Sequence, residues 1–146
     1  MADSTAFQIS IGGAPLTIID GSVYALLMPD MAEPATWTAT SGPQIQFTDQ
    51  QSGRILGVPD TDQGTQATVT PPRVFAPVLA WSVAMLDNDG NPTPVTEISQ
   101  SGFYTLQAQG TDLLLSRNEI EDYSIRPKRV GLQSADTRWQ LIIQMV

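Results

Sequence analysis

The sequence predicts an all-β protein, and three observations support this prediction. Apolar residues recur with period two in short runs, namely residues 7–11, 45–48, 67–70, 81–85 and 104–108. The spacing of an amphipathic helix is not sustained over the length of a helix anywhere in the chain. Eleven glycines and eleven prolines separate the runs, at turns such as 12–13, 41–43 and 87–92. Short alternating strands joined by such turns are typical of a sandwich or a barrel.

An internal repeat favours one of these architectures. Trp37, Trp81 and Trp139 each begin a short strand that closes a longer segment. Each segment opens with an alternating strand, at residues 7–9, 45–47 and 103–106. Second strands are predicted at 16–19, 54–57 and 113–116, and third strands at 23–26, 66–69 and 129–132. Three modules of four strands predict a β-trefoil, with modules at 1–42, 43–95 and 96–146 of a single domain spanning 1–146.

Composition limits the possible chemistry. With 146 residues, 41% hydrophobic and 15% charged, the chain is long enough for one core and too apolar for disorder. It has no histidine and no cysteine, so thiol nucleophiles, Ser–His pairs, the usual zinc sites and disulfides are excluded. We therefore expect a protein that is not an enzyme and that uses neither a cofactor nor a metal.

Charge and hydropathy indicate which partners to expect. The net charge of −8 and the pI of 4.1 disfavour nucleic acid, whose binding depends on neutralising phosphates. No stretch is apolar enough to span a membrane, and residues 1–7 show no signal-peptide pattern. We therefore expect neither a nucleic-acid nor a membrane partner, and a cytoplasmic location.

The tryptophans and the acidic residues have ordinary structural explanations. Large aromatic side chains are most often in the core, so burial is predicted for all three indoles. R-type lectins of this fold carry Gln-x-Trp, whereas Ala35, Leu79 and Thr137 stand two residues before the tryptophans. The run Asp87-Asn-Asp-Gly lacks the spacing of a calcium loop and predicts a β-turn. The pairs Glu121-Asp122 and Asp60/Asp62 are predicted to be solvated surface.

The most polar segment of the last module is residues 115–130, between its second and third strands. Four bases, Arg117, Arg126, Lys128 and Arg129, fall within thirteen residues there. Pro127 fixes its own φ and favours an extended conformation at Arg126. A stiff, charged loop is a plausible docking element, and a solvated loop with weak ion pairs is the alternative.

Residues 101–106, 116–130 and 139–141 resemble the repeat of the small β-trefoil serine-protease inhibitors of mushrooms, the mycospins. The similarity covers about 45 residues, and the following residues fall on the family motif: Arg117, Asn118, Glu121, Asp122, Ser124, Pro127, Lys128 and Val130. The motif lies in the third module here instead of the first, and Ser116 stands where the family has glycine.

The resemblance implies a fungal-type defence protein that inhibits a trypsin-like serine protease through an exposed loop. The expected inhibitory loop is 117–128, with Arg117, Asn118, Arg126 and Lys128 as candidate primary contacts and Asp122 and Ser124 as braces. The Arg117–Asn118 pair is preferred because Arg126 precedes a proline. Two alternatives stay open. One is a carbohydrate-binding lectin using exposed rings such as Tyr24, Phe75 or Tyr123, and the other is a cysteine-protease inhibitor.

Overall fold

The protein is built from thirteen β-strands in the residues that the computed structural model describes, which are 5–27, 32–71, 78–117, 128–134 and 140–146. The strands are β1 (Phe7–Ile11), β2 (Ala14–Ile19), β3 (Ser22–Ala25), β4 (Trp37–Ala39), β5 (Phe47–Asp49), β6 (Ile55–Gly57), β7 (Thr68–Thr70), β8 (Trp81–Leu86), β9 (Pro92–Val95), β10 (Gly102–Ala108), β11 (Leu114–Arg117), β12 (Lys128–Gln133) and β13 (Leu141–Met145). Helices are absent from these described ranges, so the all-β prediction is confirmed.

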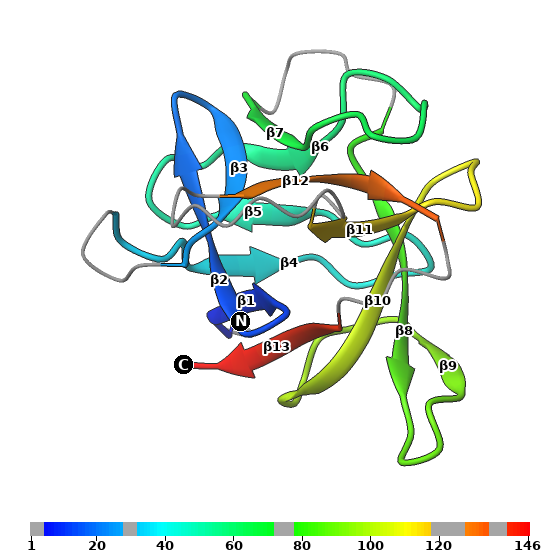
Figure 1. Cartoon of the computed structure of the whole chain (residues 1–146). Coiled ribbons are helices and arrows are strands. Elements are labelled where there is room, and N and C mark those ends of the chain that lie inside the picture. The colour runs from blue at the N-terminus through cyan, green and yellow to red at the C-terminus, as the bar shows by residue number, and fades with distance from the viewer. Residues whose placement is uncertain (1–4, 28–31, 72–77, 118–127, 135–139) are drawn as a thin grey trace.

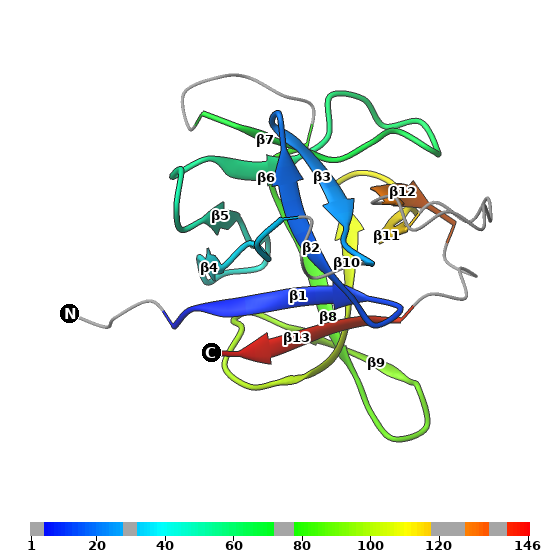
Figure 2. The ribbon, with the colours of Figure 1, turned by 60° about the vertical axis from the view of Figure 1, so that its left-hand side comes forward.

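Six strands close into an antiparallel ring. β1 pairs with β4 and with β13, β4 pairs with β5, and β10 pairs with β8 and with β13. The ring is completed where Ile45, just before β5, exchanges two backbone hydrogen bonds of 2.9 Å with Trp81 at the start of β8. Figure 2 shows β1 and β13 side by side along the lower part of the molecule.

Three hairpins lie together at one end of this ring. They are β2–β3, β6–β7 and β11–β12. β3 is bonded to β7 and to β12, and a bridge between Gln66 and Gly131 links the second hairpin to the third. β3, β7 and β12 therefore gather in the upper part of Figure 1.

The strands of the predicted modules pair with one another. Strands pair across the predicted boundaries, as β1 does with β13 and β3 with β12, so the thirteen strands form one continuous sheet. The second segment also carries an unpredicted strand, β9, because Pro92–Val95 folds back on β8. The predicted turn at Asp87 is confirmed, since its Oδ1 accepts hydrogen bonds from the N–H groups of Asp89 and Asn91, both at 2.9 Å.

The core fills the interior of the ring and extends under the hairpins. Its largest fully buried side chains include Trp37, Trp81, Phe7 and Phe47, and the two phenylalanine rings meet edge to face at 5.9 Å. Burial of Trp37 and Trp81 confirms two of the three predictions for tryptophan, whereas Trp139 lies outside the described residues.

The β8–β9 hairpin projects from the body of the protein (Figures 1 and 2). Within the described residues β9 pairs with β8 alone, and Pro92 and Pro94 stand opposite Leu86 and Ala84. Because proline has no N–H, the bonds to β8 must come from Thr93 and Val95. The outer edge of β9 therefore offers no N–H donor at residues 92 and 94, which protects this edge from pairing with another strand.

Candidate functional site

A polar groove of about 510 Å³ lies beside the β5–β6 turn. Its walls come from three parts of the chain that are distant in sequence: the β2–β3 hairpin, residues 33–36, and residues 49–54. Thr17 and Asp49 form a buried floor, while Glu33 and Arg54 stand exposed at the rim. We call this hollow the Asp49 groove.

Local hydrogen bonds within the β5–β6 turn fix the conformation of Asp49. The N–H and the Oγ–H of Ser52 both donate to Asp49 Oδ2, at 3.1 and 2.6 Å. The Asp49 N–H donates to the Arg54 carbonyl at 2.8 Å, and the Gly53 N–H donates to the Asp49 carbonyl at 2.8 Å. Gly53 has a φ of 73°, in the left-handed region that glycine adopts without strain. The turn therefore holds the carboxylate in one position beneath the groove.

The opposite wall is fastened by three further hydrogen bonds. Thr17 Oγ1 donates to the carbonyl of Glu33 at 2.7 Å, and the Ala35 N–H donates to the Leu16 carbonyl at 2.8 Å. The Gln50 N–H donates to the Thr36 carbonyl at 2.8 Å, which joins this wall to the β5–β6 turn. Both walls are thus held in place by bonds between the parts of the chain that form the groove.

Asp49 is only 6% exposed, yet one of its oxygens has no hydrogen bond within the described residues. The two donors from Ser52 both reach Oδ2, so Oδ1 is left as an acceptor in the groove. Oδ1 is not among the buried atoms that lack a partner, so it stays accessible from the groove, and a ligand that displaces water there must supply a donor of its own. The Asp49 groove is therefore suited to a ligand that supplies hydroxyl or N–H donors.

The β10–β11 turn provides an internal reference for this site. The Ala108 N–H donates to the Leu113 carbonyl five residues later, as the Asp49 N–H does to Arg54. The Thr111 N–H donates to the Ala108 carbonyl at 3.1 Å, and Ala108 is 1% exposed. Ala108 thus holds the place that Asp49 occupies in the β5–β6 turn, so the carboxylate is not needed to form such a turn.

Chemically, the Asp49 groove is a site for hydrogen bonding. Hydroxyl, amide and charged side chains surround the carboxylate, and aromatic rings are absent from its described lining. Within the described residues, acidic side chains do not gather in a group of three or more that could hold a metal ion. The site therefore offers directional polar contacts without a ring surface for stacking.

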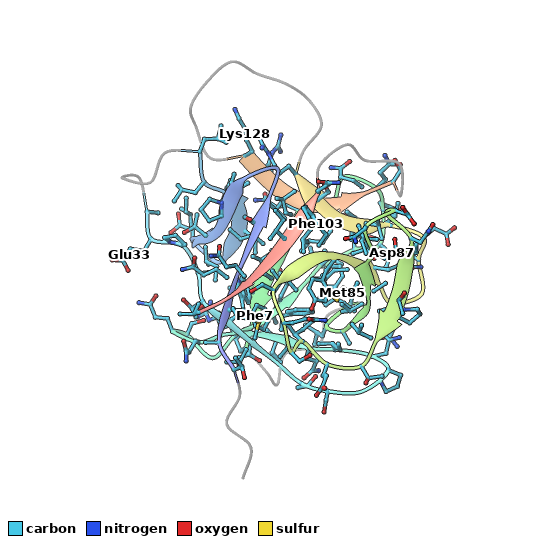
Figure 3. The ribbon with its side chains drawn as sticks, turned by 90° about the horizontal axis from the view of Figure 1, so that it is seen from below. Phe7, Glu33, Met85, Asp87, Phe103 and Lys128 are labelled. Atoms are coloured by element: carbon cyan, nitrogen blue, oxygen red, sulfur yellow. The ribbon has the colours of Figure 1, made fainter. Side chains whose placement is uncertain are left out.

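A second groove, of about 640 Å³, lies between the β8–β9 hairpin and strands β10 and β11. Its described lining is mainly apolar, including Leu86, Pro92, Pro94, Leu114 and Leu141, and carries no charged side chain. The two grooves lie on different parts of the molecule. Figure 3 shows Glu33, from the rim of the Asp49 groove, at the opposite side of the view from Asp87, in the β8–β9 turn.

The structure places the predicted inhibitory residues as follows. Arg117 ends β11 and Lys128 begins β12, and these two side chains are only 8% and 9% exposed. Arg117 Nη1 lies 3.5 Å from the Gly12 carbonyl, to which it donates. Asn118, Asp122, Ser124 and Arg126 lie outside the described residues. The described ends of the loop are thus packed into the fold, whereas a primary contact with a protease needs an exposed side chain.

The aromatic residues predicted for sugar stacking are not gathered at a groove. Tyr24, on β3, is half-buried, and Phe75 and Tyr123 lie outside the described residues. Phe103, on β10, is an exposed ring, with 43% of its surface accessible.

The Asp49 groove was not predicted from the sequence. The available signal was Asp49 followed by Ser52 and Gly53, a pattern typical of an Asp-capped turn.

Comparisons with known proteins identify a shared fold. No protein-family model matches the chain, and no curated protein matches it. Among solved structures, the chain is similar to a salivary protein from Culex quiquefasciatus that belongs to the Cysteine and Tryptophan-Rich (CWRC) family. The TM-score is 0.60 at 14% identity, over 99% of this chain and 96% of the other. At this identity the likeness concerns the fold alone.

These comparisons correct two expectations from the sequence. The resemblance to the mushroom serine-protease inhibitors is wrong, because no family model supports it and a solved structure that does match is a salivary protein of another family. Part of that resemblance was the alternation of residues 101–106, which any antiparallel strand can show. The expectation of a cytoplasmic location is also wrong, because a protein that shares this fold is a salivary protein. Within the described residues, no helix has the length and apolar character of a membrane span.

Proposed function

We propose that the protein is a carbohydrate-binding protein whose ligand is held in the Asp49 groove. One observation carries this proposal: a carboxylate that is 6% exposed lines a groove of about 510 Å³ and keeps one oxygen without a hydrogen bond in the described residues. Polar groups that converge in a preformed hollow are the usual mark of a small-ligand site. Binding without catalysis accounts for these features.

Carbohydrates meet the chemical requirement of this site. Adjacent hydroxyl groups of a sugar can donate to Asp49 Oδ1 and accept from the amide groups of Gln50 and Gln51 at the rim. Hydrogen bonds to a charged acceptor contribute about 1.5–3 kcal/mol each, more than those between neutral groups. Because Ser52 already holds the carboxylate in place, little further ordering is required on binding.

At the level of the fold, we propose that the strands follow the β-trefoil plan predicted from the sequence. Three features support it: the ring of six strands, the three mutually bonded hairpins, and the matching hydrogen bonds of the β5–β6 and β10–β11 turns. Trp37 and Trp81 also begin β4 and β8 with equal and complete burial. On this plan the β10–β11 turn is the natural control for variants at Asp49.

We also propose an extracellular location. The support is the salivary protein whose fold the chain shares along nearly its whole length. An extracellular protein that binds carbohydrate would meet the glycans of secretions and cell surfaces. Inhibition of a trypsin-like protease through residues 117–128 stays a prediction, and the burial of Arg117 and Lys128 does not favour it.

A glycan array tests the proposed function. The wild-type protein is expected to bind a defined set of glycans, and Asp49→Ala is expected to lose at least about tenfold in affinity for them, equivalent to about 1.4 kcal/mol. Asp112→Ala is the matched control, since Asp112 is an exposed acid of the β10–β11 turn outside the groove. Absence of glycan binding, or equal binding by Asp49→Ala, would contradict the proposal.

A further inference from the structure

We infer that the Asp49 groove prefers sugars that carry a free ammonium group over neutral sugars, and disfavours sulfated or acidic ones. This inference rests on the proposed function, because it names the class of carbohydrate that the same groove selects. This preference follows from the distribution of charge around Asp49 and from the single oxygen that this residue leaves available.

The first element is the geometry of the carboxylate. Ser52 donates twice to Oδ2, so a ligand meets Oδ1 and the negative charge shared by both oxygens. A neutral hydroxyl donates one hydrogen bond to this oxygen, whereas an ammonium group also adds charge attraction. Burial strengthens that attraction, because water screens a charge less where the surroundings are less polar. Asp49, at 6% exposure, therefore discriminates between a hydroxyl and an ammonium group.

The second element is the rim of the groove. Glu33 contributes a second carboxylate, and Arg54 is the one basic side chain in the described lining, which gives the groove a formal charge of −1. Arg54 is exposed, so water and salt screen its charge more than that of the buried Asp49. An anionic ligand would thus meet a buried like charge with only an exposed guanidinium to offset it.

The third element is the charge of the whole chain. The net charge is −8, and residues 1–101, which supply the entire lining, contain ten acids against Arg54 and Arg73. The field of such a surface raises the local concentration of cations and lowers that of anions. Long-range and local electrostatics therefore act in the same direction at this site.

A matched series of ligands tests the inference. Glucose, glucosamine, N-acetylglucosamine and glucose 6-sulfate differ at single substituents, and the corresponding galactose and mannose series cover ring stereochemistry. The titrations are run at about pH 6, where the amine of the amino sugar is protonated. Titration calorimetry is expected to show the amino sugar binding about tenfold tighter than its neutral parent, and the sulfate about tenfold weaker.

Two variants separate the local charge from the overall charge. Asp49→Asn keeps the size of the side chain and is expected to abolish the preference for the amino sugar. Asp112→Asn removes the same unit of charge outside the groove and is expected to retain it. Glu33→Gln, at an exposed residue where folding is not at risk, is expected to reduce the preference about twofold to threefold.

The outcomes distinguish this inference from the proposed function. If neutral and amino sugars bind with equal affinity, or if sulfated sugars bind best, the inference fails and carbohydrate binding stands. If no sugar of any series binds, the proposed function fails, and the inference fails with it. Retention of the ammonium preference in Asp49→Asn, with its fold verified by circular dichroism, would also overturn the inference.

Discussion

The contact between Gly131 and residues 64–67 joins two of the three hairpins, and replacing Gly131 by alanine should disrupt it. A Cβ at this position would lie 2.1 Å from the Thr65 carbonyl oxygen and 3.0 Å from Gln66 Cα, so the two segments must separate by about 1 Å. Three backbone hydrogen bonds of 2.7, 2.7 and 3.0 Å cross this contact. Overpacking costs about 1–3 kcal/mol and a weakened hydrogen bond about 1 kcal/mol more, which gives about 3 kcal/mol in total.

Urea unfolding followed by tryptophan fluorescence measures this free energy, and a thermal melt should show a Tm lower by roughly 6–12 °C. Gly102→Ala is the matched control, because a Cβ there meets the Met85 side chain at its flexible end, Cε, at 2.7 Å. We expect that variant to lose less than about 1 kcal/mol. If Gly131→Ala were as stable as Gly102→Ala, the close packing of the hairpins would be wrong.

Three further predictions concern the core, a buried tyrosine and the sheet edge. Trp81→Phe should destabilise the protein by about 1 kcal/mol more than Trp37→Phe in urea unfolding. The reason is that the Trp81 indole donates to the Leu56 carbonyl at 3.3 Å, whereas the Trp37 N–H has no partner among the described residues. Equal losses of stability in the two variants would contradict this. Burial raises the pKa of Tyr104 above its ordinary 10.0, and its neutral phenol donates a 2.7 Å hydrogen bond to the Gln100 carbonyl that a phenolate could not make. The neutral phenol therefore contributes stability below about pH 10 that is lost at higher pH, and Tyr104→Phe should show a smaller loss of Tm above pH 10 than the wild type. Finally, the double variant Pro92→Thr/Pro94→Thr restores two N–H donors on the outer edge of β9. Strand pairing between molecules should then raise the apparent mass measured by light scattering. A strictly monomeric variant would refute the protective role of the prolines.

Much of the strand order could be predicted from the sequence, because it depends on local periodicity. The run at 7–11 alternates strictly, and β1 buries Phe7, Ile9 and Ile11 as that pattern predicts. The predicted second and third strands of each segment are found, paired with each other as β2–β3, β6–β7 and β11–β12. β9 was missed because two prolines in four residues argue against a strand, and only an edge position tolerates them.

The candidate site was less predictable, because its walls come from residues far apart in the chain. The turn at Asp49 shows a local signal, since Ser52 and Gly53 follow at turn spacing. Nothing local indicates that Glu33 and Thr17 lie beside it, since that depends on the packing of β2 against residues 33–36. Conversely, the many charges of residues 117–128 drew attention to a segment whose described ends are buried.

The most direct test of the central claim is a titration of ¹⁵N-labelled protein with glucosamine and galactosamine, followed by amide chemical shifts. Carbohydrate binding in the Asp49 groove predicts saturable shifts concentrated at residues 33–36 and 49–54, which line the groove, and smaller or absent shifts in the equivalent β10–β11 turn. Absence of saturable shifts, or shifts centred on the β10–β11 turn or on the groove beside β9, would show that the Asp49 groove is not a carbohydrate site.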